Sequence, residues 1–268
     1  MAIGHWRAVL PWLLPLPLFA GGAHAESTDM RIVTKVRLTE CCIEYRGLIT
    51  SEANDGVYEL YDEASPKPTT LVIESDGGGA AAAMELGNWM LDHDMDVQVD
   101  SHCYSSCANY IFLAGHAKLL ASHASLMWHG GTMQPIDRAE LEHLLDDMLG
   151  QLEPEAREAV LAERPREKLI LQLDESRLEL LARETRFFAR IGVDERITVL
   201  GHLFEHELLA NDHDYSGWDL SLDDLAKLGV RGIKVVDATE WQPWPSRDGL
   251  LVYRISLDRL PGFDPRLP

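Results

Sequence analysis

Three short stretches of this chain carry residues that can act together in nucleophilic catalysis. They are the glycine run Gly77-Gly78-Gly79, a serine at position 106 and a histidine at position 129. A serine hydroxyl is a weak nucleophile, so it needs a base within hydrogen-bond reach and N–H donors that stabilise the developing oxyanion. The sequence therefore predicts Ser106 as a nucleophile and His129 as its base.

Two backbone N–H groups are candidate oxyanion donors. Ser106 stands where a helix is expected to begin, so the N–H of Cys107 belongs to the unpaired N–H groups of that helix end. Gly78 can supply a second N–H, because a turn without side chains lets the backbone approach a substrate carbonyl. The alternative is that the glycines form only a tight turn and that Ser106 is only a helix cap.

The elements that must position these residues alternate between strands and helices. Short apolar runs predict strands, and glycines at their ends predict turns. Strand, helix and strand in repeated order imply a mostly parallel sheet with right-handed crossovers, whose chemistry gathers at the carboxyl ends of the strands. The predicted elements are strands at 71–73, 97–99, 126–128 and, last, 233–236, and helices at 80–91 and from Ser105-Ser106 to a stop at Gly115.

Three other residues near Ser106 are alternative candidates for the nucleophile or the base. Ser105 is an alternative nucleophile, and Cys107 is a weaker one if it is oxidised. Lys118 is the lysine inside this region, but it follows the helix that starts at Ser106. We therefore do not expect a serine-lysine dyad.

The N-terminus has the composition of a secretory signal peptide. Residues 1–25 contain one charge, Arg7, an apolar stretch from Ala8 to Ala20 and small residues before Glu26. A membrane anchor is the alternative, but the stretch is shorter than a bilayer span and contains three prolines. We expect an exported, periplasmic protein without a stable membrane anchor, and a single domain over residues 26–268.

The charge balance limits the class of partner. The chain has 24 basic and 44 acidic residues, and loss of Arg7 with the signal peptide leaves 23 basic residues and a net charge of −21. Such a balance argues against nucleic acid or an anionic membrane as a partner. We expect no cofactor.

Exported proteins enter an oxidising compartment, where disulfides can form, so the four cysteines can pair. The sequence alone leaves open which of three full pairings occurs among Cys41, Cys42, Cys103 and Cys107. Cys103 and Cys107 flank Ser106, so a bridge between them would hold the serine turn.

A helical arm is expected at about 136–191. Asp137 and Glu140 form a capping-box pattern, and Pro154 and Pro165 interrupt the helical run before its stop near Gly192. Apolar residues at helical spacing form one face, which packs either on the protein's own core or against another copy in a homo-oligomer. They are Leu141, Leu144, Leu145, Met148, Leu149 and Leu152.

The motifs together resemble the proteolytic subunit of the Clp protease, within the Clp/crotonase superfamily. The resemblance lies in IEYRGLIT from Ile43, LVIESDGG, SSCANYIFLAG and LMWHGG, and it covers about half of the chain after the signal peptide. It implies a Clp/crotonase-like α/β fold of repeated β-α-β units with a helical arm insertion. It also places the nucleophile at Ser106, nine residues before Gly115, the base at His129 and the oxyanion donors at Gly78 and Cys107.

The third member of the implied triad is the weakest correspondence. The family's aspartate falls on Gly217, and Asp214 and Asp219 are the nearest carboxylates. Asp214 is the preferred candidate, with Asp219 as the alternative. Asp76 also replaces the proline of the family's glycine turn.

A zinc site is the competing hypothesis. His202, Glu205 and His206 match the H-x-x-E-H pattern of inverted zinc peptidases, with Asp212 and His213 nearby. A chain with 11 histidines and 44 acidic residues forms such a match by chance, so the sequence favours an exposed face and no metal.

The favoured function is that of a serine peptidase-like hydrolase that acts on peptides or small acyl substrates. The alternative is a catalytically inactive binding or assembly protein of the same fold, because a fold alone does not establish activity. A neutral histidine base predicts that activity falls below about pH 6–7.

Overall fold

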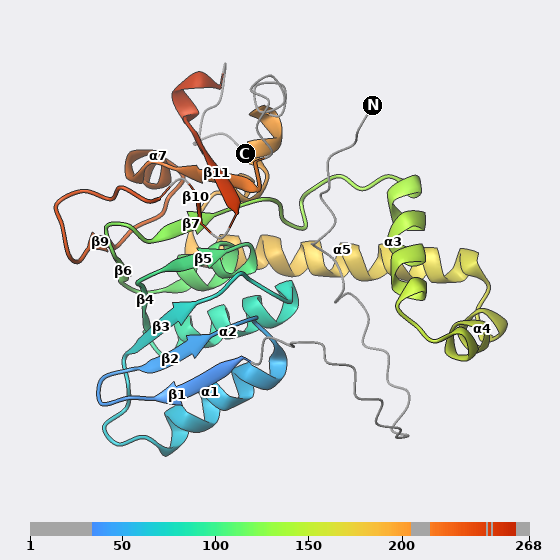
Figure 1. Ribbon diagram of the computed structural model, residues 1–268, viewed down its shortest axis with the longest axis horizontal. Coiled ribbons are helices and arrows are strands. Elements are labelled where there is room, and N and C mark those ends of the chain that lie inside the picture. Colours follow the sequence, from blue (N-terminus) through green and yellow to red (C-terminus); the bar gives the residue numbers. More distant parts are fainter. Residues whose placement is uncertain (1–33, 205–214, 245, 248, 261–268) are drawn as a thin grey trace. The chain divides into compact units, whose positions relative to one another are not determined.

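The computed structural model describes residues 34–204, 215–244, 246–247 and 249–260. The predicted signal peptide, residues 1–25, lies outside this part of the chain. The described residues fall into two compact units, one of residues 134–183 and the other of residues 34–133 together with those from 184 onward. Figure 1 shows the elements of both units along the chain.

The larger unit contains a six-stranded sheet with the order β1-β2-β3-β4-β6-β9. The strand β1 is antiparallel to β2, and all other neighbours are parallel. This confirms a mixed α/β architecture with a mostly parallel sheet. The bounds are β1 Lys35–Leu38, β2 Ile43–Arg46, β3 Thr70–Glu74, β4 Asp96–Val99, β6 Lys118–Leu120 and β9 Ile233–Val235.

Alternating side chains explain why these segments form strands. In β3, Leu71 and Ile73 are buried while their neighbours are half-buried. Ile43 of β2 lies opposite Leu71 in the register, and Val97 of β4 lies opposite it on the other side. Because successive side chains of a strand point to opposite faces, this register gathers the buried residues on one face.

Helices follow the strands of this sheet, and of the first three, α1 was not predicted, whereas α2 and the helix after Ser106 were. The helix α1, Ser51–Glu63, contacts β1 and β2, and its N-cap residue Thr50 accepts a hydrogen bond from the N–H of Ala53. The helix α2, Ala80–Asp92, contacts η1, a π-helix at Cys107–Phe112. The predicted helix after Ser106 is thus present, but its central turns are wider than those of an α-helix.

A second group of strands continues from the six-stranded sheet. Single bridges join Ser75 to Cys103 and Trp128 to Trp218, and so connect β3 to β5 and β7 to β8. The C-terminal strand β11 pairs in parallel with β8 and antiparallel with β10, so the strand predicted at 233–236 is not the last one. The bounds are β5 His102–Tyr104, β7 Ser125–Met127, β8 Gly217–Leu220, β10 Ser246–Arg247 and β11 Leu250–Ile255.

The remaining short elements of this unit lie around β8. Ser221 is the N-cap residue of α7, and its side chain accepts a hydrogen bond from the N–H of Asp224. The bounds are η2 Glu195–Thr198, η3 Leu200–Phe204, α7 Leu222–Lys227 and η4 Leu257–Arg259.

Among the described helices, none is both long and apolar enough to cross a membrane.

The smaller unit is helical, as expected for the arm. It contains α3 (Arg138–Gly150), α4 (Pro154–Glu163) and the first part of α5 (Arg166–Ile191). Asp137 and Glu140 form the predicted capping box of α3. The predicted apolar face of α3 packs within the unit against α5. The buried residues of this cluster are Leu141, Leu145 and Leu149 of α3 with Leu169, Ile170 and Leu173 of α5.

Candidate active site around Ser106

The glycine turn after β3 requires glycine at two positions. Gly77 has φ +104° and Gly78 has φ +151°, conformations that side chains disfavour. A Cβ on Gly77 would lie 2.9 Å from the carbonyl oxygen of Tyr104, and one on Gly78 would collide with the backbone of Ile49. The turn therefore fits tightly between the chain before Ser106 and the chain at Ile49.

Hydrogen bonds hold this turn on both sides but leave one N–H unused. The N–H of Ile49 donates to the Gly77 carbonyl at 2.8 Å, and the N–H of Gly79 donates to the Ile49 carbonyl at 3.0 Å. The Ser75 hydroxyl accepts from the N–H of Gly77 at 3.0 Å. Within the described chain, the N–H of Gly78 donates to no acceptor.

Ser106 lies directly against this turn. Its Oγ donates a hydrogen bond to the Gly78 carbonyl at 2.9 Å, and the residue is 6% exposed. Ser106 is the N-cap residue of η1, and Ser105 before it has φ +56°. A non-glycine residue with positive φ is uncommon and marks a position that the surrounding structure constrains.

The start of η1 offers a second unused N–H. The N–H of Asn109 donates to the Ser105 carbonyl at 2.8 Å, whereas the N–H of Cys107 has no acceptor in the described part of the chain. The N–H groups of Gly78 and of Cys107, the residue after Ser106, therefore have no acceptor among the described residues. An oxyanion hole formed by these two groups stays a prediction.

The structure also chooses among the cysteine pairings. It joins Cys103 to Cys107 and Cys41 to Cys42 by disulfides. The first bridge spans the turn that carries Ser106, so it restrains the residue that supplies the second N–H. It also removes Cys107 as a nucleophile, because a disulfide sulfur is no thiolate.

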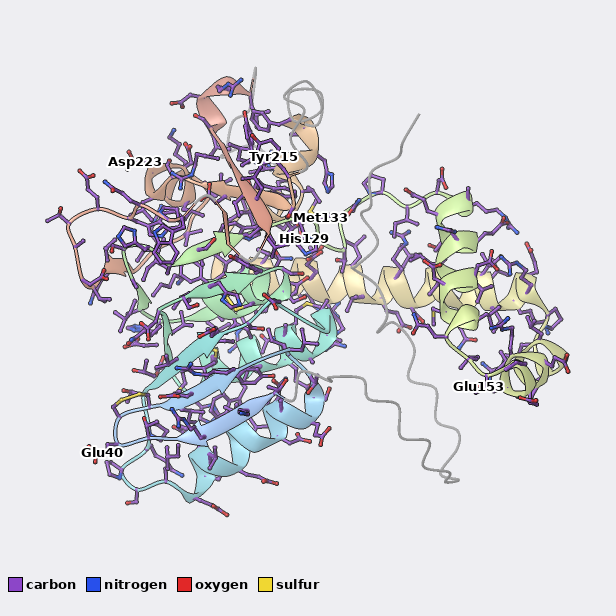
Figure 2. The ribbon with its side chains drawn as sticks, in the orientation of Figure 1. Glu40, His129, Met133, Glu153, Tyr215 and Asp223 are labelled. Atoms are coloured by element: carbon purple, nitrogen blue, oxygen red, sulfur yellow. A yellow bond between two sulfur atoms is a disulfide. The ribbon has the colours of Figure 1, made fainter. Side chains whose placement is uncertain are left out.

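His129 follows β7 and the Trp128 bridge, at the strand end where the sequence places it (Figure 2). Its imidazole is surrounded by protein, so burial lowers its pKa from the ordinary value of 6.5, and the neighbouring His202 lowers it further. No hydrogen bond joins His129 to Ser106 among the described residues, because the serine hydroxyl donates to Gly78. The nucleophile and the base are thus on neighbouring elements but not hydrogen-bonded.

The segment after His129 is anchored to η1 and α5. Asn109 donates from Nδ2 to the Gly130 carbonyl at 3.0 Å, and Thr132 donates its hydroxyl proton to Oε2 of Glu184. Tyr110 donates to Oε1 of the same carboxyl group at 2.6 Å. Glu184 is fully buried, and burial raises its pKa although the two hydroxyl groups oppose that shift.

Sequence reasoning missed the role of Glu184, although a signal was present. The residue stands on the same helical stripe as Leu180 and Phe187, both buried. A carboxyl group on the apolar face of a helix needs hydrogen-bond donors, because an unpaired buried charge is costly. This argument predicts from the sequence that Glu184 has buried hydrogen-bond donors as partners.

Asp219, the alternative third member of the predicted triad, is paired with an arginine in the structure. Its carboxylate receives hydrogen bonds from Nε and Nη2 of Arg254, the latter at 2.8 Å. Burial raises the pKa of Asp219, and the guanidinium opposes this shift. Asp214 lies outside the described residues.

Gly217 occupies the position that corresponds to the family's aspartate. A Cβ there would lie 3.1 Å from the Cβ of His129 and would collide with the Trp128 carbonyl. An aspartate at 217 would therefore require the backbone to shift.

The neighbour of His129 is instead His202, in the 3₁₀ helix η3. Its ring packs edge-on against Trp218, with centroids 5.4 Å apart. Glu205 and His206 lie outside the described residues, and the described chain contains no cluster of three metal-ligating side chains. In the structure His202 lies close enough to His129 to lower the pKa of that histidine.

Lys118 lies at the opposite end of the helix from Ser106. Its Nζ donates to the carbonyl of Gly115, the residue that ends the helix, at 2.7 Å. This position excludes Lys118 as a base for Ser106.

No model of a known protein family matches this chain, and no curated protein matches it either. The site is therefore interpreted from its own geometry and chemistry.

Proposed function

We propose that this protein is an exported serine hydrolase of the Clp/crotonase type, which cleaves peptides or small acyl substrates with Ser106 as nucleophile. One observation carries the proposal. The Ser106 hydroxyl donates to the Gly78 carbonyl at 2.9 Å, and within the described chain the N–H groups of Gly78 and of the next residue, Cys107, have no acceptor. A nucleophile next to two N–H groups without acceptors is the arrangement that acyl transfer needs.

The mechanism requires one rearrangement of a side chain. Ser106 must turn its hydroxyl from the Gly78 carbonyl towards His129, a change between staggered rotamers. The imidazole then takes the proton as Oγ attacks the substrate carbonyl, and the N–H groups of Gly78 and Cys107 bind the oxyanion. Water, activated by the same histidine, releases the acyl group.

The lowered pKa of His129 suits this role, because it keeps the imidazole neutral at pH 7. The orienting group for the histidine is Asp214 in this proposal. Removal of such a carboxylate leaves residual activity in serine hydrolases, since the oxyanion donors and substrate binding still contribute.

The same geometry supports a second candidate function. In the structure the serine hydroxyl donates to a backbone carbonyl and not to His129. A protein that keeps this arrangement with a substrate present would bind peptides or acyl groups without cleaving them. That protein would be a binding or assembly component, in the same compartment and with the same tendency to form homo-oligomers.

A fluorophosphonate probe distinguishes the two candidates. The active enzyme reacts covalently at Ser106, so the full chain gains the mass of the probe and the Ser106→Ala variant does not. We expect labelling of the Ser106→Ala and His129→Ala variants to fall at least about 10³-fold, as for other triad deletions. Intact mass and peptide mapping locate the label.

Ser105→Gly is the matched control. Glycine tolerates the positive φ of position 105, so this variant keeps the turn and removes only the alternative hydroxyl. Labelling at the wild-type rate supports Ser106. If the wild-type chain stays unlabelled while circular dichroism shows it folded, the binding function replaces the hydrolase.

A further inference from the structure

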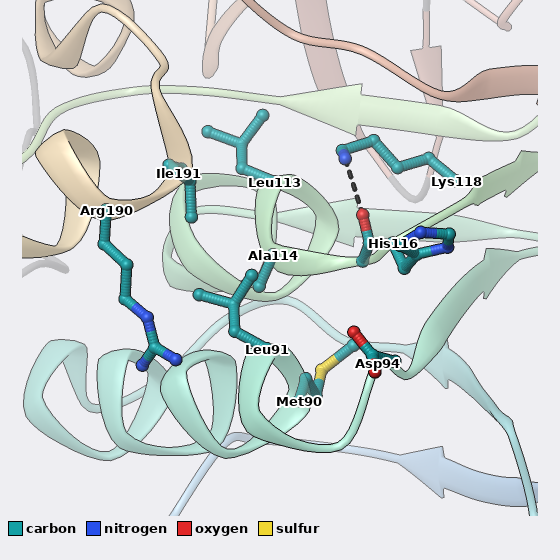
Figure 3. A pocket seen from close by; sticks show the side chains of 10 residues that line it. Met90, Leu91, Asp94, Leu113, Ala114, His116, Lys118, Arg190 and Ile191 are labelled. Atoms are coloured by element: carbon teal, nitrogen blue, oxygen red, sulfur yellow. Dashed lines mark hydrogen bonds between the residues drawn. The ribbon is translucent and has the colours of Figure 1, made fainter.

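A hollow of about 200 Å³ lies in the larger unit, away from Ser106. It is partly open to solvent and is lined by residues at the C-terminal ends of α2, of the helix that contains η1, and of α5, as Figure 3 shows. Its volume equals that of about six or seven liquid water molecules and is below the size of drug-binding pockets. The hollow therefore admits only a small molecule.

Its lining combines apolar side chains with polar and charged ones, one of which is an amine. The apolar side chains are those of Met90, Leu91, Leu113 and Ile191. Lys118 lines the same space, is 5% exposed and donates from Nζ to the Gly115 carbonyl at 2.7 Å. An ammonium group has three N–H donors, but within the described chain this one has a single hydrogen-bond acceptor.

The lysine is therefore poorly supported as a cation. Burial lowers its pKa from 10.5 to about 8, against the opposing attraction of Asp96. About a tenth of the molecules then carry a neutral, nucleophilic amine at pH 7, whereas an ordinary lysine is almost entirely protonated.

The charged groups near the hollow do not make it an anion site. Arg190 donates to Asp92 at 2.5 Å and to Oδ1 of Asn88 at 2.7 Å, so its guanidinium already has partners. His116 is exposed and lies 3.6 Å from Asp96. Asp94 also lines the hollow and would repel an anion.

We propose that Lys118 is a covalent binding site for a small aldehyde or ketone with a short hydrocarbon chain, held in this hollow as an imine. The neutral amine attacks the carbonyl carbon, so that a C–N bond forms and the oxygen takes a proton to give a carbinolamine. Loss of water then forms the C=N bond. Both hydrogens of the amine leave with the oxygen in that water, so no oxidant or reductant is needed.

The proposal is independent of hydrolysis at Ser106, because the two groups lie at opposite ends of one helix. An imine also costs less free energy at a buried site than a carbamate, because the carbamate would place a negative charge there. The hydrocarbon tail of the carbonyl compound would contact the apolar walls.

Reductive trapping tests the site with butanal as the probe. The full chain is treated with sub-millimolar butanal and sodium cyanoborohydride, and peptide mass spectrometry measures the rate of butylation at each lysine. At pH 7.5 we expect Lys118 to react at least about tenfold faster than the exposed Lys35 and Lys168, because of its larger neutral fraction. The rate at Lys118 should rise with pH and level off above about pH 8.

Two variants give the controls. Ile191→Phe fills the hollow and should slow butylation of Lys118 at least about tenfold while leaving Lys35 unchanged. Ser106→Ala should leave the Lys118 rate unchanged, whether or not the protein is a hydrolase. The proposal is overturned if Lys118 reacts no faster than Lys35 in the wild-type chain, or if Ile191→Phe has no effect on its rate.

Discussion

The two ends of the helix that runs from Ser106 to Ala114 carry opposite chemistry. At its first residue, a hydroxyl group and unused N–H groups face a glycine turn. At its other end, the amine of Lys118 donates to the carbonyl of Gly115. A helix N-terminus favours negative charge, which suits an oxyanion at the Ser106 end, whereas at the other end burial opposes the charge of the Lys118 amine.

The two ends differ in how the fold holds them. Two glycines, a disulfide and several backbone hydrogen bonds restrain the Ser106 end. The Lys118 end instead holds a buried amine with a single acceptor, which reduces the free energy of unfolding. The fold thus fixes the geometry of the first end with several restraints, whereas at the second end it leaves a buried amine with one hydrogen-bond acceptor.

Gly78→Ala should have the largest effect on stability. The added Cβ collides with the backbone of Ile49 and must adopt φ +151°. We expect the free energy of unfolding to fall by at least about 3 kcal/mol, because steric strain and an unfavourable φ add. Urea denaturation followed by circular dichroism measures it.

Gly79→Ala is the matched control, because Gly79 has φ −65°, a value that alanine adopts without strain. We expect a change of less than about 1 kcal/mol there. Equal destabilisation by the two substitutions would show that the turn at Gly78 is not sterically required.

Lys118→Met should stabilise the fold at neutral pH. The lysine pKa is lowered to about 8 in the fold, so between pH 8 and 10.5 the unfolded chain binds more protons and wild-type stability rises with pH. Below pH 8 the amine is protonated in the fold, and the free-energy cost of burying its charge is present in full. Methionine removes this cost but also removes the hydrogen bond to Gly115. The free energy of unfolding should therefore rise by about 2 kcal/mol at pH 7, and this gain should vanish by about pH 10.5.

Lys227→Met provides the opposite case. Hydrogen bonds to Asp224 and Asp258 raise the pKa of Lys227, so its removal should slightly destabilise the fold. Chemical denaturation at pH 7 and pH 10.5 compares both variants. A Lys118→Met variant that is less stable than wild type at pH 7 would contradict the contrast between the two ends.

The smallest expected effect concerns the base at the Ser106 end. Burial and His202 lower the pKa of His129, so activity should fall at a pH below 6.5, the ordinary histidine value. The His202→Gln variant removes one of these two causes and should move the midpoint upward, by less than about one pH unit. The pH profile of kcat/KM measures it, and NMR titration of the imidazole does so without activity. A midpoint above 6.5 in the wild type would remove His129 from its assigned role.

Local patterns predicted β3, α2, β4, the helix after Ser106, β7 and β9, but not β1, β2, α1, β5, β6 or β8. Runs such as Leu71–Ile73 and the capping box at Asp137 depend on residues close in sequence, and the structure confirms them. The strand β11 was missed because its pairing with β8 depends on a register between distant segments. The same register places Asp219 opposite Arg254, and the two side chains form hydrogen bonds that the sequence pattern does not predict.

The positions of Ser106 and His129 on their elements were predictable, whereas their hydrogen bonds were not. The sequence places Ser106 at a helix start and His129 at a strand end. The acceptor of the Ser106 hydroxyl depends on the rotamer of the serine and on the position of a turn 28 residues earlier in the chain. Motif spacing contains no information on that choice.

The carboxyl group of Glu184 has a consequence for motion at the site. One of its oxygens accepts from Tyr110, within the helix that Ser106 begins, and the other from Thr132, three residues after His129. Displacement of this buried group therefore moves the serine helix and the histidine segment together. Thermal fluctuations should then change the separation of Ser106 and His129 less than they change the position of either residue.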